Sequence, residues 1–151
     1  MLQPKLVLAP IDFSAPSRQA ADAAAEIASR FGAALLLVHV VPALPKLPPG
    51  FLFKEGEYEQ CLHEEAAARL TELSARYAQG GISVQSEIGC ANDVGPEILR
   101  IAEHHKVDLV VIATHGMTGW NKMIFGSVAE KVVRLASSAV LLLRAAPEHQ
   151  G

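Results

Sequence analysis

The stretch "VDLVVIATHGMTGWNKMIFGSVAE", residues 107–130, contains the pattern of a strand, a long loop and the start of a helix. Its first seven residues are almost all apolar, which is typical of a buried parallel strand. Its last four residues, Ser127–Glu130, have the S-x-x-E form of a capping box, which predicts that a helix begins there. Gly116, Gly119 and Gly126 lie in the connection. The stretch therefore predicts a strand-to-helix loop with a role beyond that of a simple turn.

The same alternation of strands and helices extends along the whole chain. Short apolar runs predict the strands, and apolar residues at spacings of three and four predict the helices. An unbroken β-α-β-α-β-α-β-α-β order requires a parallel sheet with helices on both faces and right-handed crossovers. We therefore expect one doubly wound α/β domain over residues 1–151, with residues 82–88 at a sheet edge. The expected strands are 5–10, 34–41, 82–88, 107–113 and 139–144, and the expected helices are 14–31, 57–79, 92–105 and 127–137.

The composition excludes several classes of protein. Half of the 151 residues are hydrophobic and 19% are charged, which excludes a disordered chain. The net charge of -3 gives no electrostatic argument for binding nucleic acid or an anionic membrane. No apolar run reaches the roughly 18 residues of a membrane-spanning helix. The first residues lack the pattern of a signal peptide, and the two cysteines form no CxxC pair. A cytoplasmic location with free thiols is therefore expected.

The loop after the fourth strand has features of a phosphate-binding site. The carboxyl ends of parallel strands are where such sheets bind ligands. A helix that begins near Ser127 offers free backbone N–H groups and a partial positive charge to an anion. Gly126 and Gly116 would let phosphate oxygens approach the main chain, and Lys122 could add a positive charge. The alternative is that the glycines are ordinary loop residues and that Ser127 only caps its helix. Neither a Walker A loop nor a G-x-G-x-x-G fingerprint is present.

Asp12 and the histidines are the other candidate functional residues. Asp12 follows the first strand, where its carboxylate could bind a ligand hydroxyl or amine, or cap the first helix together with Ser14; the two roles are compatible. None of the six histidines has the spacing of a zinc site. His39 is expected to be a packed, hydrogen-bonded residue of the second strand. His115, beside Gly116, is expected to bond the loop backbone, because no nucleophile or acid–base pair can be assigned near it.

At this point the sequence resembles the universal stress proteins. Their ATP-binding members have a G-x-x-G-x9-G-S/T pattern after the fourth strand. The aligned residues here are Ala113, Gly116, Gly126 and Ser127, so an alanine replaces the first glycine. The segments "LAPIDFS", "LLLVHVV" and "SSAVLLLR" look like the first, second and last strands of the family. The resemblance covers nearly the whole chain.

The resemblance implies a fold, a ligand and a partner. The fold is a flavodoxin-like, adenine nucleotide alpha hydrolase-like sheet of strand order 3-2-1-4-5. The ligand is ATP, with or without Mg²⁺, and no dedicated protein metal site or catalytic residue is implied. The partner is a second copy of the chain, paired through the last strand, Ala139–Arg144. The residues implied to surround the nucleotide are Pro10, Ile11, Asp12, Val40, Ala113, His115, Gly116, Gly126, Ser127 and Val128.

Two functions from different classes remain open from the sequence. The first is a dimeric, cytoplasmic, ATP-binding regulatory protein of the stress response. The second is a protein-interaction module of the same fold that binds no nucleotide and has a purely structural glycine loop. A slow ATPase is a third, weaker alternative. The loop Pro42–Gly56, which is long and rich in proline, is interpreted as either a lid over the adenine or a rigid surface loop.

Overall fold

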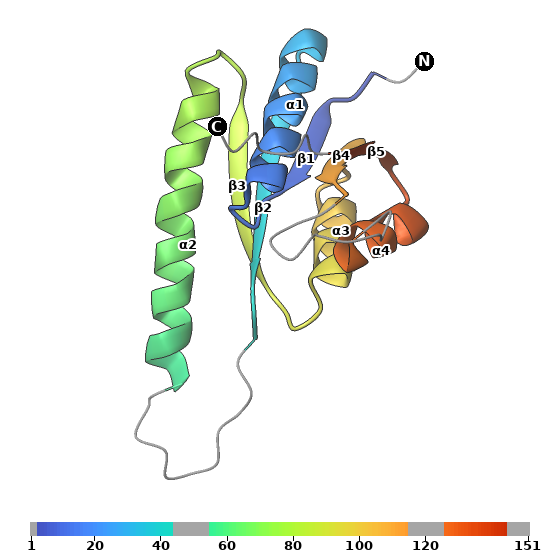
Figure 1. Cartoon of the computed structure of the whole chain (residues 1–151). Helices are drawn as coiled ribbons and strands as arrows, with labels where there is room; N and C mark the ends of the chain where they lie inside the picture. The colour runs from blue at the N-terminus through green and yellow to red at the C-terminus, as the bar shows by residue number, and fades with distance from the viewer. Residues whose placement is uncertain (1–2, 44–54, 115–125, 145–151) are drawn as a thin grey trace, which may run out of the picture.

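A computed structural model gives the structure of the chain and describes residues 3–43, 55–114 and 126–144. Strands and helices alternate from the first element to the last (Figure 1). The strands are β1 (Leu6–Pro10), β2 (Ala34–Val41), β3 (Val84–Cys90), β4 (Leu109–Ala113) and β5 (Ala139–Leu143). The helices are α1 (Ala15–Phe31), α2 (Glu55–Ala78), α3 (Val94–His104) and α4 (Ser127–Leu135).

The five strands form one parallel sheet of order β3-β2-β1-β4-β5, which confirms the predicted fold class and strand order. β1 lies in the centre and pairs with β2 on one side and with β4 on the other. The chain order reverses between β1 and β4, where Val7 lies opposite Leu109. Ligands of doubly wound sheets bind at such a reversal, beyond the carboxyl ends of the strands. β3 is at one edge, as predicted, and β5 is at the other.

Each face of the sheet has its own hydrophobic core, because successive side chains of a strand point to opposite faces. One core packs the side chains of Leu35 and Leu37 against α1 and α2, and the other packs Leu36 and Val38 against α3 and α4. In Figure 1 the two pairs of helices lie on opposite sides of the sheet. The central strands are buried on both faces and are therefore continuously apolar.

The ends of α1 follow local sequence signals. Ser14 is the N-cap, and its side chain accepts a hydrogen bond from the backbone N–H of Ser17, as predicted. Gly32 ends the helix with a left-handed φ of 64°, which glycine adopts without steric cost. The buried face is formed by alanines such as Ala24 and Ala28, so the helix approaches the sheet closely. Phe31, in the last turn, is 54% exposed and does not continue this face.

No helix in the described part of the chain is long and apolar enough to cross a membrane. The Pro42–Gly56 loop, interpreted from the sequence as a lid, lies largely outside the described residues.

Candidate functional site

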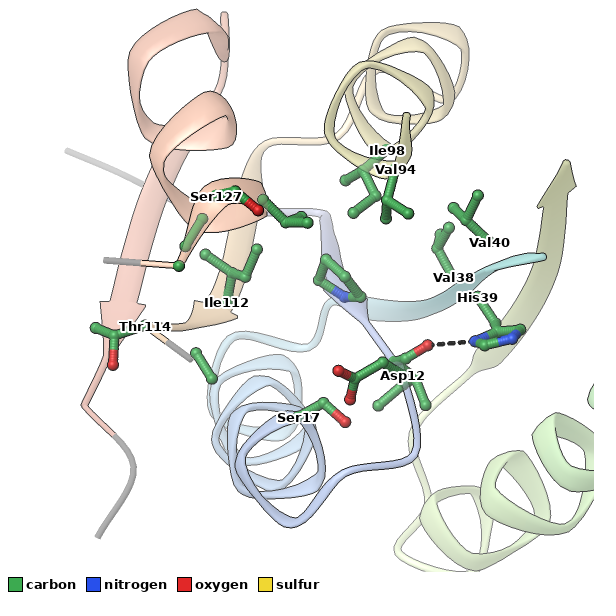
Figure 2. Close-up of a pocket in the computed structure, with 16 residues that line it drawn as sticks. Asp12, Ser17, Val38, His39, Val40, Val94, Ile98, Ile112, Thr114 and Ser127 are labelled. Carbon is green, nitrogen blue, oxygen red and sulfur yellow. Dashed lines mark hydrogen bonds between the residues drawn. The ribbon is translucent and has the colours of Figure 1, made fainter. Parts of the chain in front are cut away.

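A pocket of about 260 Å³ opens where β1 and β4 end, at the reversal of strand order (Figure 2). Its lining combines a polar turn after β1, the apolar ends of the central strands and the first turns of α3 and α4. The residues that line it are Pro10, Ile11, Asp12, Ser17, Val38, His39, Val40, Val94, Ile98, Ile112, Ala113, Thr114, Gly126, Ser127, Val128 and Ala129.

The turn between β1 and α1 provides the acidic group of the pocket. Asp12 Oδ1 accepts hydrogen bonds from the backbone N–H of Ser14, at 3.0 Å, and from the Ser14 hydroxyl, at 2.5 Å. The carboxylate therefore orders the start of α1 together with Ser14, which is the capping role considered from the sequence. Because Asp12 also lines the pocket, the capping and ligand-binding roles are compatible in this geometry. Ser17, in the first turn of α1, is buried beside it.

His39 lies in the C-terminal half of β2 and is hydrogen-bonded, as the sequence predicted. Its Nδ1 is 2.6 Å from the carbonyl oxygen of Ile11 (Figure 2). A carbonyl oxygen only accepts, so Nδ1 donates the proton and Nε2 is the acceptor in the neutral ring. His39 thus ties β2 to the residue that precedes Asp12.

An apolar wall forms the opposite side of the pocket. Val94 and Ile98 come from the first turns of α3, and Val128 comes from α4. Asp93, at the N-cap of α3, makes no side-chain capping bond; its Oδ2 instead accepts a hydrogen bond from Lys131 of α4 at 2.5 Å. This ion pair joins the two helices that form the wall.

α4 begins at Ser127, as the sequence predicted, but the residue that caps it differs from the capping-box interpretation. The S-x-x-E pattern predicted Ser127 as the N-cap, but Gly126 occupies that position, with φ −69° and ψ 159°, and no side chain caps the helix there. The reason is a hydrogen bond at Gly126. Its backbone N–H donates to the Thr114 carbonyl oxygen at 2.5 Å. That bond fixes the extended cap geometry one residue earlier. Ser127 is therefore the first helical residue, and its hydroxyl lies at the pocket (Figure 2).

Every predicted site residue that the structure describes lines this pocket. They are Pro10, Ile11, Asp12, Val40, Ala113, Gly126, Ser127 and Val128. The other two, His115 and Gly116, lie outside the described residues, as does Lys122. Ala113 is 7% exposed, so its methyl group is packed at the position where the family pattern has a glycine.

Sequence reasoning missed half of the lining. Val94, Ile98 and Ile112 resemble ordinary core residues, and no sequence signal separates a pocket wall from a packed core. Ser17 was missed because a serine in the first turn of a helix usually serves the helix itself. Thr114, next to the predicted Ala113, could have been included from its position at the end of β4.

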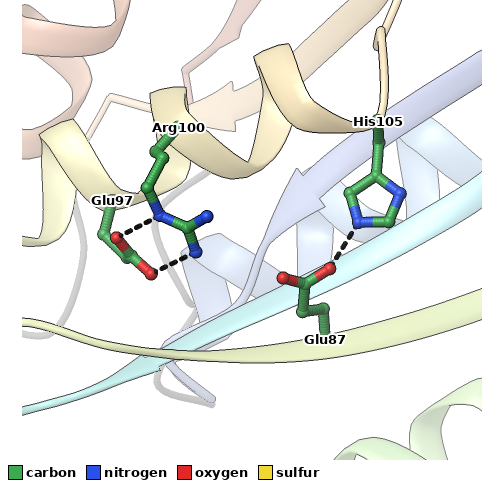
Figure 3. A network of polar contacts seen from close by, with 4 residues as sticks. All are labelled: Glu87, Glu97, Arg100 and His105. Atoms are coloured by element: carbon green, nitrogen blue, oxygen red, sulfur yellow. Dashed lines mark hydrogen bonds and ion pairs between the residues drawn. The ribbon is translucent and has the colours of Figure 1, made fainter.

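Two charged side chains of α3 pair with each other, and its C-cap residue contacts β3 (Figure 3). Arg100 donates two hydrogen bonds to the Glu97 carboxylate, and these bonds lower the pKa of Glu97 against the opposing effect of burial. His105 Nε2 contacts Glu87 of β3, which joins the end of α3 to the sheet edge. Within residues 3–43, 55–114 and 126–144, no cluster of His, Cys, Asp and Glu is arranged to hold a metal ion.

The model of the universal stress protein family matches residues 4–144. The chain belongs to the universal stress protein family. It is 32% identical over 143 residues to a universal stress protein of Methanocaldococcus jannaschii, covering 93% of this chain and 82% of the relative. It is also 32% identical over 139 residues to the universal stress protein A homolog 1 of Coxiella burnetii, covering 91% and 94% of the two chains.

Solved structures of the family share the fold. The UspA protein of Lactobacillus plantarum superposes with a TM-score of 0.81 at 23% identity, over 93% of this chain and 97% of that one. A universal stress protein in complex with cAMP gives a TM-score of 0.67 at 21% identity, over 94% and 98% of the two chains. The Archaeoglobus fulgidus protein in complex with dAMP gives 0.65 at 21% identity, again over 94% and 98%.

Proposed function

We propose that this universal stress protein is a cytoplasmic regulatory protein of the stress response that binds ATP in the pocket at the ends of β1 and β4. One observation carries the proposal: the described residues that the family pattern implies for the nucleotide, from Pro10 to Val128, converge on a single pocket although they lie far apart in sequence. Members of the same fold bound to cAMP and dAMP support an adenine nucleotide as the ligand class.

The chemistry of the lining suits the parts of ATP separately. The apolar wall, together with Val40 of β2, suits the flat, largely apolar adenine ring. The Asp12 carboxylate accepts hydrogen bonds from ribose hydroxyls or from the adenine amine. The start of α4, where no side chain caps the described backbone, leaves N–H groups for the phosphates. Ser127 adds a hydroxyl at that end.

The second candidate function is an interaction module that binds no nucleotide. The observation that favours it is Ala113, whose packed methyl group stands where ATP-binding members have a glycine. A methyl group at this point restricts how closely a phosphate can approach the main chain. Titration calorimetry with ATP-Mg separates the two candidate functions.

We also propose a homodimer in which β5 pairs with β5 of a second copy. β5 is at the sheet edge, and no other strand of the described residues pairs with its outer side. Such an edge has unpaired N–H and C=O groups that favour another strand. Leu141 of β5 is 38% exposed and Leu135 of α4 is 55% exposed, so apolar surface accompanies the open edge. A two-fold antiparallel pairing would bury both.

The nucleotide proposal is tested by titration calorimetry of the wild type and of Gly126→Val with ATP-Mg. The dihedral angles of Gly126 lie in a region that valine also adopts, so the variant should fold and lose no more than about 1 kcal/mol at the N-cap. Its side chain should block phosphate approach and abolish binding. Val133→Ala, on the exposed face of α4, is the matched control and should bind as the wild type does. Absence of heat with the wild type would reject ATP binding and leave the interaction module.

A further inference from the structure

The backbone on the N-terminal side of Asp12 is held at two points. The N–H of Ile11 donates to the Val38 carbonyl oxygen at 2.7 Å, and the Ile11 carbonyl oxygen accepts from His39 Nδ1 at 2.6 Å. Both partners belong to β2. The residue before Asp12 is therefore fixed to the sheet.

The residue after Asp12 has an unusual conformation. Phe13 has a φ of 64°, and only one other described non-glycine residue, Lys106, has a positive φ. A left-handed conformation is unfavourable for a residue with a side chain, because its Cβ atom comes too close to the following carbonyl oxygen. It is rare for a bulky residue. Strain of this kind collects at binding and catalytic sites when the surroundings hold it in place.

The left-handed turn at Phe13 has a direct effect on Asp12. It reverses the chain so that the N–H and hydroxyl of Ser14 meet Asp12 Oδ1, which is an Asx-type turn. The orientation of the carboxylate thus depends on the conformation of Phe13. A change in the backbone of Phe13 would therefore move the N–H and the hydroxyl of Ser14 relative to Asp12 Oδ1.

Three contacts hold Phe13 in this conformation. Its ring packs on His39 with the centroids 4.7 Å apart, and the guanidinium carbon of Arg69 lies 4.0 Å from the ring centroid. Its carbonyl oxygen accepts a hydrogen bond from Arg18 at 3.0 Å. Arg69 belongs to α2, and no described residue of α2 lines the pocket.

Arg69 binds the ring in preference to a carboxylate. Glu65 and Glu72 stand four residues before it and three after it on α2, at spacings that allow ion pairs. Within the described residues Arg69 forms an ion pair with neither of them. A cation over an aromatic ring is a directed contact, strongest when it covers the face. The Arg69 side chain therefore covers the ring of Phe13, the residue in the left-handed conformation.

We infer that Arg69, Phe13 and His39 form a positioning stack that fixes the Asp12 carboxylate in its ligand-binding orientation, with Arg69 as a positioning residue in α2. The role in binding rests on the nucleotide function proposed above. The role in ordering the turn does not, because it concerns contacts within the chain. α2 thereby becomes part of the binding apparatus without lining the pocket.

The test compares Arg69→Gln, which removes the cation, with Arg69→Lys, which keeps it. Arg76→Gln, on the same helix, is the matched control. The first readout is hydrogen exchange of the Ser14 amide in ligand-free protein, because this N–H donates to Asp12. Exchange should be faster in Arg69→Gln and in Phe13→Ala, and near the wild-type rate in Arg69→Lys and Arg76→Gln.

The second readout is ATP-Mg affinity by calorimetry. Arg69→Gln should weaken it about 2- to 5-fold, the equivalent of an exposed cation–π contact, and Arg69→Lys should restore most of the loss. In an Asp12→Asn background the Arg69→Gln change should have a smaller effect, because both act through one carboxylate. Unchanged Ser14 exchange in Arg69→Gln and Phe13→Ala would overturn the inference. If Ser14 exchange is faster in Arg69→Gln and Phe13→Ala but the wild type binds no ATP, only the proposed nucleotide function and the binding role that rests on it would be overturned.

Discussion

The proposed dimer predicts a specific effect of proline at position 142. The carbonyl oxygen of Leu143 accepts from the N–H of Thr114, and the N–H of Ala139 donates to Asp108, so residues 139 and 143 face β4. Backbone N–H and C=O groups of successive residues alternate in direction along a strand. The N–H of Leu142 must therefore point to the open edge. Leu142→Pro removes a donor from that edge and spares the ladder with β4.

The size of the effect follows from the symmetry. Each copy loses one outward donor, so a two-fold dimer loses two hydrogen bonds. At about 0.5–1.5 kcal/mol each, the loss is about 1–3 kcal/mol, which weakens the dimer about 5- to 150-fold. The strand itself remains paired with β4, and the monomer should keep its fold.

Analytical ultracentrifugation over a range of protein concentrations measures the effect. Leu142→Ala keeps the N–H and is the matched control, so it should dimerise more strongly than the proline variant. Leu143→Pro, whose N–H faces β4, should instead lower the stability of the monomer. A wild type that is monomeric at micromolar concentration, or a Leu142→Pro protein that dimerises as the wild type does, would refute the reasoning.

Three further predictions concern stability. Gly32→Ala places a methyl group at a φ of 64° and should cost about 1–2 kcal/mol in urea unfolding, although no neighbouring atom obstructs it. Burial, helped by the hydrogen bond to Asp22, raises the pKa of Tyr77 above its ordinary 10.0, so the unfolded chain loses this proton first and stability falls as the pH rises above 10. Tyr77→Phe should flatten that alkaline decline in pH-dependent unfolding. The Arg100 hydrogen bonds lower the pKa of Glu97, so their contribution is present above pH 4.5 and is lost as the pH falls below it; Arg100→Gln should reduce that acid loss.

Much of the fold could be predicted because local and global signals agree. The apolar runs and Gly32 gave correct elements, and the unbroken alternation fixed a parallel sheet. Asp12 could be placed at the pocket because it directly follows a buried strand. The predicted N-cap of α4 was wrong because Gly126 donates a hydrogen bond to Thr114, which is distant in sequence. This bond favours Gly126 as the N-cap over Ser127, which the local pattern favours. Tertiary contacts of this kind have no signal in a local pattern.

The apolar wall of the pocket and the turn after Asp12 could not be predicted from the sequence, and the reasons are related. Ile98 contributes to the pocket and to a hydrophobic core at once, and the sequence shows only that it is apolar. The left-handed turn at Phe13 depends on Arg69, which is separated from it by more than a helix and a strand. Position-specific strain of this sort arises from packing, so it appears only in three dimensions.

The central position of β1 determines when the pocket can exist during synthesis. Its lining begins at Pro10 and ends at Ala129, so the ribosome must reach at least Ala129 before the pocket can form. At about 5–20 residues per second, the interval between Val40 and Ala129 lasts on the order of 5–20 s. Until β4 (Leu109–Ala113) has been made, the side of β1 that pairs with it has no partner strand in the nascent chain. A ligand of this pocket therefore acts on the finished protein and cannot guide the early steps of its folding.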